Sequence, residues 1–176
     1  MNDKQVPVQT NLDTIACQMR GVLDAEFAAW YPRSIDTVCG GFFSDLDYEW
    51  NVVGPQQKFV VTQARHVWSA AHAARFYNTD APFKGIATHG IAFLRDKMRD
   101  PRWGGFYDMV TREGEPVLED GRIIKKAYGN SFAVYALAEC AGVTGDTAAL
   151  RMAQETFRWL EAHSYDPRHG GYLQFI

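Results

Sequence analysis

The chain contains nearly the same seven residues twice, as DPRWGGF at 100–106 and as DPRHGGY at 166–172. The two copies differ at two positions, and one of those exchanges keeps an aromatic ring. A weaker third copy, VCGGFF, lies at 38–43. Paired glycines permit a backbone with positive φ, so their recurrence indicates one turn geometry that is used three times. The sequence therefore predicts a structural repeat with a period of about 65 residues.

Between these turns, apolar side chains recur at steps of three and four residues, which is typical of amphipathic helices. The predicted helices span residues 12–30, 58–77, 82–100, 126–141 and 146–163. Pro32 ends the first helix, the NTD sequence at 78–80 is expected to cap the third, and Asp146 is expected to cap the fifth. The sequence GVTGD at 142–146 is expected to break the chain between the last two helices. Residues 106–123, with turn signals at EGEP and EDG, predict a short β-hairpin.

This pattern predicts an all-α fold of helical-hairpin repeats with short β-hairpins in the GG loops. A single hairpin cannot bury both of its faces, so such units stack into a solenoid or close into an α/α toroid. A closed ring of six hairpins at this period would need roughly 390 residues, and fewer than three hairpins fit here. We therefore expect residues 1–176 to be the N-terminal portion of a single α/α-barrel domain, cut after the third GG turn.

The composition narrows the class of protein. With 47% hydrophobic and 22% charged residues and a net charge of −3, the chain is typical of a globular domain and offers nothing to attract nucleic acid. Its three cysteines fit neither a zinc site nor a disulfide framework, which predicts a reducing, cytoplasmic location. No run of about 18 apolar residues occurs, so we expect no membrane partner.

The histidines fit no metal-binding pattern, and we expect each to lie in the core or on the surface, with no metal bound. They are His66, His72, His89, His163 and His169.

Three stretches of the sequence are informative in combination: GGFFSDLD at 40–47, KFVVTQARHVW at 58–68 and KKAYGNSFAVYALAECAGVTGD at 125–146. Together they resemble the N-acylglucosamine 2-epimerase superfamily, which includes cellobiose 2-epimerases and mannose or sulfoquinovose isomerases. The match runs from about Asp36 to Ile176 but covers only the first half of the family's domain. The resemblance implies an (α/α)6 barrel whose inner helices surround a sugar pocket. It also implies epimerisation or aldose–ketose isomerisation at C2 of an aldose, without a cofactor, and often a homodimer.

The resemblance also implies roles for single residues. Arg65 would hold the carbonyl oxygen of the open-chain sugar and stabilise the charge of an enediolate. Tyr128 would contact a sugar hydroxyl, Trp68 would stack on the ring, and Asn130 would touch the ligand. The family's two acid/base histidines, whose near-neutral pKa suits removal and return of a proton, fall beyond Ile176 and match no position here.

Other interpretations of these residues are open. Arg65 would need a partner if buried, for example an ion pair with Asp45 or Asp47. Tyr128 and Trp68 could equally pack in the core.

Phe132 and Tyr135, at helical spacing from Tyr128, are expected to be core residues.

Two other functions are also open. A glycosidase or lyase on the same barrel would use carboxylates such as Asp45, Asp47 and Asp108 and would cleave a bond rather than rearrange a sugar. A non-catalytic helical-repeat module would bind a protein through an apolar patch on its last helix.

Overall fold

The computed structural model of the protein describes residues 8–77 and 82–176. They form two compact units, one that ends at Ser34 and one that spans Ile35–Ile176. The first unit contains helix α1, Val8–Trp30, which begins four residues earlier than predicted and ends before Pro32 as expected. The expected cap at 78–80 lies outside the described residues. No helix in the described residues is both long and apolar enough to cross a membrane.

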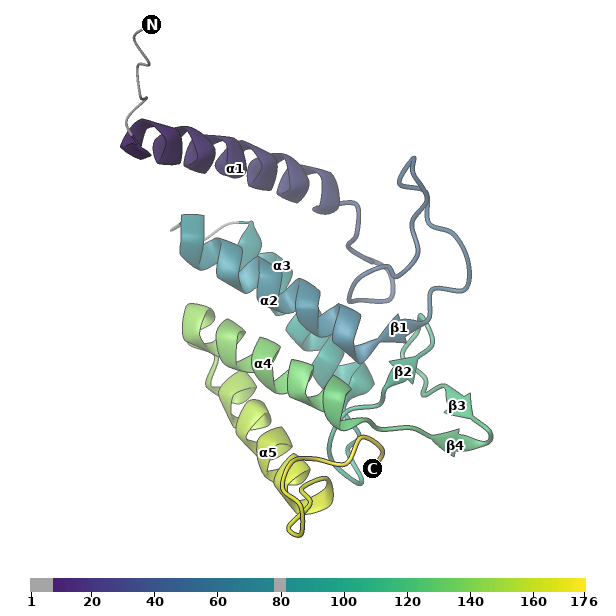
Figure 1. The fold of residues 1–176 in the computed structure, drawn as a ribbon. Helices are drawn as coiled ribbons and strands as arrows, with labels where there is room; N and C mark the ends of the chain where they lie inside the picture. The colour runs from purple at the N-terminus through teal and green to yellow at the C-terminus, as the bar shows by residue number, and fades with distance from the viewer. Residues whose placement is uncertain (1–7, 78–81) are drawn as a thin grey trace, which may run out of the picture. The chain divides into compact units, whose positions relative to one another are not determined.

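The second unit consists of two helical hairpins (Figure 1). Its helices are α2 Val60–Tyr77, α3 Phe83–Phe93 with the π-helical turn η1 Leu94–Met98, α4 Ala127–Thr144 and α5 Thr147–His163. Helices α2 and α4 pack side by side, while α3 packs on α2 and α5 packs on α4. We call α2 and α4 the inner helices and α3 and α5 the outer helices. The predicted fold class, helical-hairpin repeats of an (α/α)6 barrel with short strands in the GG loops, is confirmed.

Two helix boundaries differ from the prediction for identifiable reasons. Residues Lys58–Phe59 form strand β1, so α2 begins only at Val60. Helix α4 continues into the expected break and ends at Thr144, where Gly145, with a φ of 75°, caps the helix in the left-handed conformation. Asp146 caps α5 as predicted, because its carboxylate accepts two backbone N–H groups of the first turn at 2.8 and 3.1 Å.

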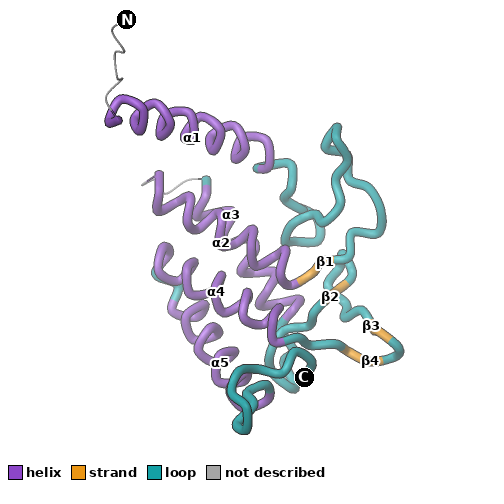
Figure 2. The backbone as a smooth tube through the Cα atoms, in the orientation of Figure 1, coloured by secondary structure: helices purple, strands orange, loops and turns teal. Residues whose placement is uncertain are grey.

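Short strands gather where the inner helices begin (Figure 2). Strand β1 pairs antiparallel with β2, Met109–Val110, which joins the start of α2 to the segment after the second GG pair. Strands β3, Leu118–Glu119, and β4, Arg122–Ile123, form the hairpin predicted within 106–123. A bridge between Lys126 and Phe175 repeats the β1–β2 pairing one unit later.

The three GG turns share one geometry, as the repeat predicted. Each begins with an aspartate, Asp36, Asp100 or Asp166, whose N–H donates to the carbonyl of the second glycine at 3.0 Å. The N–H of the first glycine donates back to the aspartate carbonyl at 2.9 to 3.1 Å. The carboxylate of each aspartate accepts two backbone N–H groups inside the turn. All six glycines have positive φ, which explains why the pair recurs.

The glycines of the first two turns are also covered by an aromatic ring from an outer helix. A Cβ on Gly41 would lie 2.8 Å from Phe93, and a Cβ on Gly105 would lie 2.8 Å from the indole of Trp159. A Cβ on Gly171, in the third turn, would meet no described atom within 4 Å. The first two turns therefore require glycine for space as well as for φ.

A buried lysine fastens each of these two turns to the following inner helix. Lys58 Nζ lies 2.9 Å from Asp36, and Lys125 Nζ lies 2.7 Å from Asp100. Asp36 also binds Arg112, from the next repeat, at 2.8 Å. These ion pairs hold the end of the molecule at which the inner helices begin.

Candidate functional site

The exposed side of α2 carries two of the four residues that we expected to contact a substrate. Arg65, Trp68 and His72 follow one another at steps of three and four residues, which places them along one side of the helix. Gln63 and Ala64 face the core. Arg65 is exposed and Trp68 is half-buried.

Arg65 forms no ion pair with a carboxylate in the part of the chain that the structure describes. The alternative of an ion pair with Asp45 or Asp47 is therefore wrong. Asp47 instead accepts hydrogen bonds from the side chain and the backbone N–H of Asn51, at 3.0 and 2.8 Å. The guanidinium of Arg65 is consequently a positive charge that faces solvent.

Aromatic rings from both inner helices form a continuous row beside Arg65, which we call the aromatic ledge. Trp68 stacks on Tyr135 of α4, with 5.0 Å between ring centroids. Tyr135 meets the edge of Phe132 at 6.0 Å, and Phe132 meets Tyr128 at 4.9 Å. The core position expected for Tyr135 is wrong, because 42% of this residue is exposed.

The charge of Arg65 affects the pKa values of two neighbouring side chains, Tyr135 and His66. Burial raises the pKa of Tyr135, Glu139 adds to this effect, and Arg65 opposes it. Burial and, to a smaller extent, the charge of Arg65 together lower the pKa of His66 to about 4, so this imidazole is neutral at pH 7. Glu139 is already bound by Arg75 at 3.2 Å, and His72 Nδ1 lies 3.3 Å from the same carboxylate oxygen. At the Tyr135 hydroxyl, Glu139 therefore outweighs Arg65, and the charge that a negative ligand group would meet is the Arg65 guanidinium itself.

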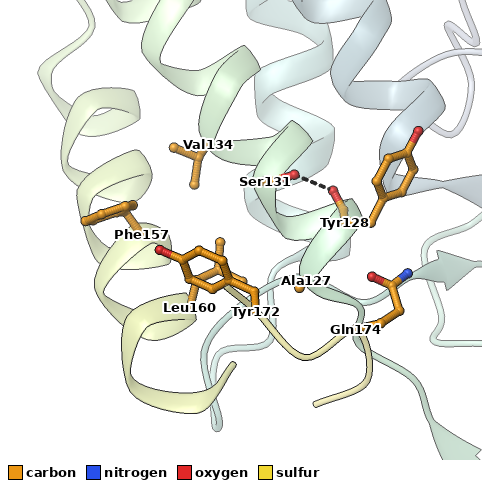
Figure 3. Close-up of a pocket in the computed structure, with 8 residues that line it drawn as sticks. All are labelled: Ala127, Tyr128, Ser131, Val134, Phe157, Leu160, Tyr172 and Gln174. Atoms are coloured by element: carbon orange, nitrogen blue, oxygen red, sulfur yellow. Dashed lines mark hydrogen bonds between the residues drawn. The ribbon is translucent and has the colours of Figure 1, made fainter. Parts of the chain in front are cut away.

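Tyr128 lies in the first turn of α4 at the end of the ledge, and 54% of it is exposed. Its ring points away from Phe157 and Tyr172 (Figure 3). Its carbonyl accepts a hydrogen bond from Ser131 Oγ at 2.7 Å. The phenol is thus available to a ligand on the same side as the ledge.

Asn130 is placed differently from what we expected. It is 1% exposed, its Oδ1 accepts from the N–H of Phe106 at 2.7 Å, and its Nδ2 donates to the carbonyl of Phe106 at 3.2 Å. Nδ2 also donates to the carbonyl of Lys126 at 3.0 Å. The amide therefore bonds to backbone and faces no open surface.

Sequence reasoning missed Gln63, which holds Phe42 in the way that Asn130 holds Phe106. A signal for it exists, because Gln63 follows Lys58 by five residues and Asn130 follows Lys125 by five residues. Such a spacing recurs with the repeat and marks equivalent positions.

Two of the three carboxylates named for a glycosidase, Asp47 and Asp108, are engaged elsewhere. Asp108 is 6% exposed and accepts from Lys126 Nζ at 2.7 Å, and Asp47 is bonded to Asn51. Glycoside hydrolysis requires two carboxyl groups that face one scissile bond. No group of three or more potential metal ligands occurs within residues 8–77 and 82–176.

The family described as N-acylglucosamine 2-epimerase (GlcNAc 2-epimerase) matches residues 41–175 of the chain. The chain belongs to this family. The matched range includes the QAR motif at 63–65 and the AYGNSF motif at 127–132, so the resemblance inferred from these motifs is confirmed.

Similar proteins of known sequence and structure agree with this membership. A cellobiose 2-epimerase from Bacteroides fragilis is 30% identical over 147 residues, which are 84% of this chain and 36% of the relative. A D-mannose isomerase from Marinomonas mediterranea is 27% identical over 154 residues, 88% of this chain and 37% of the relative. The solved cellobiose 2-epimerase of Bacillus thermoamylovorans B4167 gives a TM-score of 0.84 at 26% identity, over 93% of this chain and 41% of that chain. The chain thus spans less than half the length of these relatives.

Within this member of the N-acylglucosamine 2-epimerase family, a hollow of about 400 Å³ lies between α4, α5 and the third GG turn (Figure 3). Its mostly apolar lining consists of Ala127, Tyr128, Ser131, Val134, Phe157, Leu160, Tyr172 and Gln174. Val60 on α2 is the repeat equivalent of Ala127, and α4 covers it so closely that a Cβ on Gly129 would lie 2.5 Å from Val60. The hollow therefore occupies on α4 the place that α4 occupies on α2. We interpret it as a helix-packing surface and place the candidate site on the ledge.

Proposed function

We propose that this chain forms part of a sugar epimerase or isomerase that acts at C2 of an aldose through an enediolate. One observation carries the proposal: the exposed guanidinium of Arg65 lies beside an aromatic ledge built from two neighbouring inner helices. Family membership and the names of the relatives, cellobiose 2-epimerase and D-mannose isomerase, support it.

The chemistry assigns a part to each exposed residue. When the proton on C2 leaves, its electron pair moves to the carbonyl oxygen, which becomes negative. A guanidinium stays protonated at all working pH values and stabilises that oxygen where the charge develops. The Trp68 indole already stacks on Tyr135 and on His72, with 5.0 and 4.6 Å between ring centroids, so the sugar meets the edge of this stack. The Tyr128 hydroxyl bonds to a sugar hydroxyl. In this proposal, Arg65 and the ledge bind the sugar and stabilise charge, and histidines of the family pattern beyond Ile176 move the proton.

We also propose a cytoplasmic location. All three cysteines, Cys17, Cys39 and Cys140, are free in the structure, and this supports a reducing compartment. The homodimer implied by the resemblance stays a prediction.

The proposal is tested first by binding and then by exchange. Titration with cellobiose and with mannose should shift the Trp68 indole N–H signal in nuclear magnetic resonance spectra. The variant Arg65→Ala should weaken this binding by about tenfold or more, which corresponds to roughly 1.4 kcal/mol. Binding without any effect of the variant would contradict the role of Arg65, and absence of binding to either sugar would contradict a site on the ledge.

Exchange is measured in heavy water with the whole enzyme of which this chain forms part, and the proposal expects deuterium at C2 of the sugar. Appearance of new reducing ends instead would favour the glycosidase. A protein-binding module would use the apolar hollow and leave the Trp68 signal unchanged by sugar.

A further inference from the structure

Two buried amide side chains each hold both backbone groups of one residue. Gln63 Oε1 accepts from the N–H of Phe42 at 2.8 Å, and Gln63 Nε2 donates to the carbonyl of Phe42 at 2.9 Å. Asn130 makes the same pair of bonds to Phe106, at 2.7 and 3.2 Å. We call this two-bond arrangement the amide clasp. Gln63 is 0% exposed and Asn130 is 1% exposed, so water does not compete for either clasp.

The two amide clasps occupy equivalent positions in the two repeats. Gln63 and Asn130 are 67 residues apart (130 − 63), as are Lys58 and Lys125 (125 − 58). In both repeats, the residue that the clasp holds directly follows the GG pair. Each inner helix is therefore bound by its first turns to the GG turn that precedes it, through a buried lysine and a buried amide.

Each clasp lies two residues from a residue of the candidate site. Gln63 precedes Arg65 by two residues, and Asn130 follows Tyr128 by two residues. Two residues correspond to about 200° around a helix, so the clasp and the site residue face opposite sides of the same turn. The clasp grips the turn from the buried side, and Arg65 and Tyr128 project from the exposed side.

We propose that Gln63 and Asn130 are positioning residues that set the rotation and depth of the two inner helices, and so fix where the Arg65 guanidinium and the Tyr128 phenol stand. The inference rests on the proposed function. It assigns Asn130 a role different from the ligand contact that the resemblance implied. Neither residue touches the sugar, and both act through the helix turn that they hold.

An amide is the side chain suited to this role. It presents one acceptor and two donors on a single planar group, and can satisfy the N–H and the carbonyl of one residue at once. An ionised carboxylate of the same shape only accepts, so it loses one bond and opposes the backbone carbonyl. A protonated carboxyl again offers one donor and one acceptor.

This chemistry gives a test in which pH switches the clasp. In the variants Gln63→Glu and Asn130→Asp, burial raises the pKa of the new carboxyl above its ordinary value. The group is protonated and the clasp is complete at low pH, and the clasp is lost as pH rises through that raised pKa. We expect the Kd for cellobiose or mannose to match the parent at pH 5 in Gln63→Glu, and to approach it in Asn130→Asp, whose single O–H cannot also donate to the Lys126 carbonyl. At pH 8 it should be about tenfold weaker, because a small displacement of a positioned group carries a large penalty.

A matched control is available in Gln56. Its amide is 2% exposed and bonds to the backbone of Ser44 and Asp45 at 2.9, 3.3 and 2.8 Å, but it lies in a loop and not on an inner helix. The variant Gln56→Glu places the same buried carboxyl in the protein and should lower stability as pH rises, with a Kd that stays within about twofold of the parent while the protein is folded. This separates a positioning role from a general loss of stability.

Circular dichroism at each pH shows whether a variant is folded, so that a change in Kd can be distinguished from unfolding. A pH-dependent Kd in the two clasp variants, and not in Gln56→Glu, supports the proposal. A parental Kd at pH 8 in folded Gln63→Glu and Asn130→Asp overturns it, as does the same loss in Gln56→Glu. A variant that unfolds at pH 8 is judged at the highest pH at which it is folded.

If the parent binds neither sugar, the proposed function fails and the clasp is tested separately. The Arg65 side-chain N–H and Tyr128 ring signals of the clasp variants should then titrate together with the amide signals of Phe42 and Phe106. Signals of Arg65 and Tyr128 that ignore this titration overturn the proposal.

Discussion

The pair of variants Gly105→Ala and Gly171→Ala separates the two reasons for the GG turn. Both glycines are the second of their pair, and their φ values are 68° and 79°. They differ in what surrounds them. A Cβ on Gly105 would lie 2.8 to 2.9 Å from three atoms of the Trp159 indole, whereas a Cβ on Gly171 would meet no described atom within 4 Å. Alanine at Gly171 therefore tests φ alone, and alanine at Gly105 tests φ together with the aromatic cover.

The expected losses of stability follow from two costs, that of the positive φ and that of the overlap with Trp159. A left-handed conformation costs an L-residue about 1–2 kcal/mol, which is the whole effect expected at Gly171. Forcing a methyl group into the packed Trp159 indole adds about 1–3 kcal/mol at Gly105. We expect Gly105→Ala to lose about 2–5 kcal/mol of the free energy of unfolding, and to exceed Gly171→Ala by about 1–3 kcal/mol.

Urea denaturation followed by circular dichroism measures both losses. With an m-value of about 2 kcal/mol per M, the midpoint of Gly105→Ala should fall by about 1–2.5 M, and that of Gly171→Ala by about 0.5–1 M. The fluorescence of the indole reports whether Trp159 has moved. Equal midpoints for the two variants would refute the idea that the outer-helix ring makes the second glycine necessary.

Three further predictions concern the charged groups. Arg65→Lys should weaken sugar binding by about tenfold in a calorimetric titration, because a lysine does not reproduce the planar fork of the guanidinium; an unchanged Kd would show that only charge matters there. Lys125→Met should lower the free energy of unfolding by about 3–5 kcal/mol in urea, since it leaves the Asp100 carboxylate buried without its cation; a loss below 1 kcal/mol would contradict this. Burial alone would raise the pKa of Asp100, but hydrogen bonds from Lys125 and from two backbone N–H groups outweigh it and lower the pKa. The pKa of Asp100 in the native state is then below its unfolded value of about 3.9, so the stability that the ionised carboxylate contributes is present above pH 4 and is lost as pH falls. Asp100→Asn should therefore reduce the fall of the urea midpoint with acid, measured between pH 3 and 6.

The sequence was sufficient for features that depend on local pattern. Repeated glycine pairs and helical periodicity predicted the turns and five helices, and Asp146 was recognisable as a cap because capping needs only its own first turn. The start of α2 was not predictable in this way. Lys58 and Phe59 are extended because β2, some fifty residues later, pairs with them. Local propensity does not contain that partner.

In the candidate site, too, local sequence pattern predicted some features, and contacts with distant parts of the chain decided the others. Arg65 was identified by motif, and its exposure was decided by which side of α2 the neighbouring helix α4 leaves open. Asn130 and Tyr135 were misplaced because residue type and spacing do not say which side of a helix faces a returning loop. Asn130 meets Phe106 across 24 residues of chain, and Tyr135 lies on the open side beside Trp68.

We expect the carboxylate of Asp36 to couple the unfolding of the first repeat to that of the second. It binds Lys58, which leads into the first inner helix, and also Arg112, which belongs to the following repeat. Opening the first turn therefore breaks a contact of the second, and opening the loop of the second removes a partner of the first. Amide hydrogens in the first GG turn and in the segment around Arg112 should exchange with solvent at a common rate, as one cooperative unit. A stack of hairpins joined only through helix faces would lose its hairpins one by one, whereas we expect the shared carboxylate of Asp36 to make two of them unfold together.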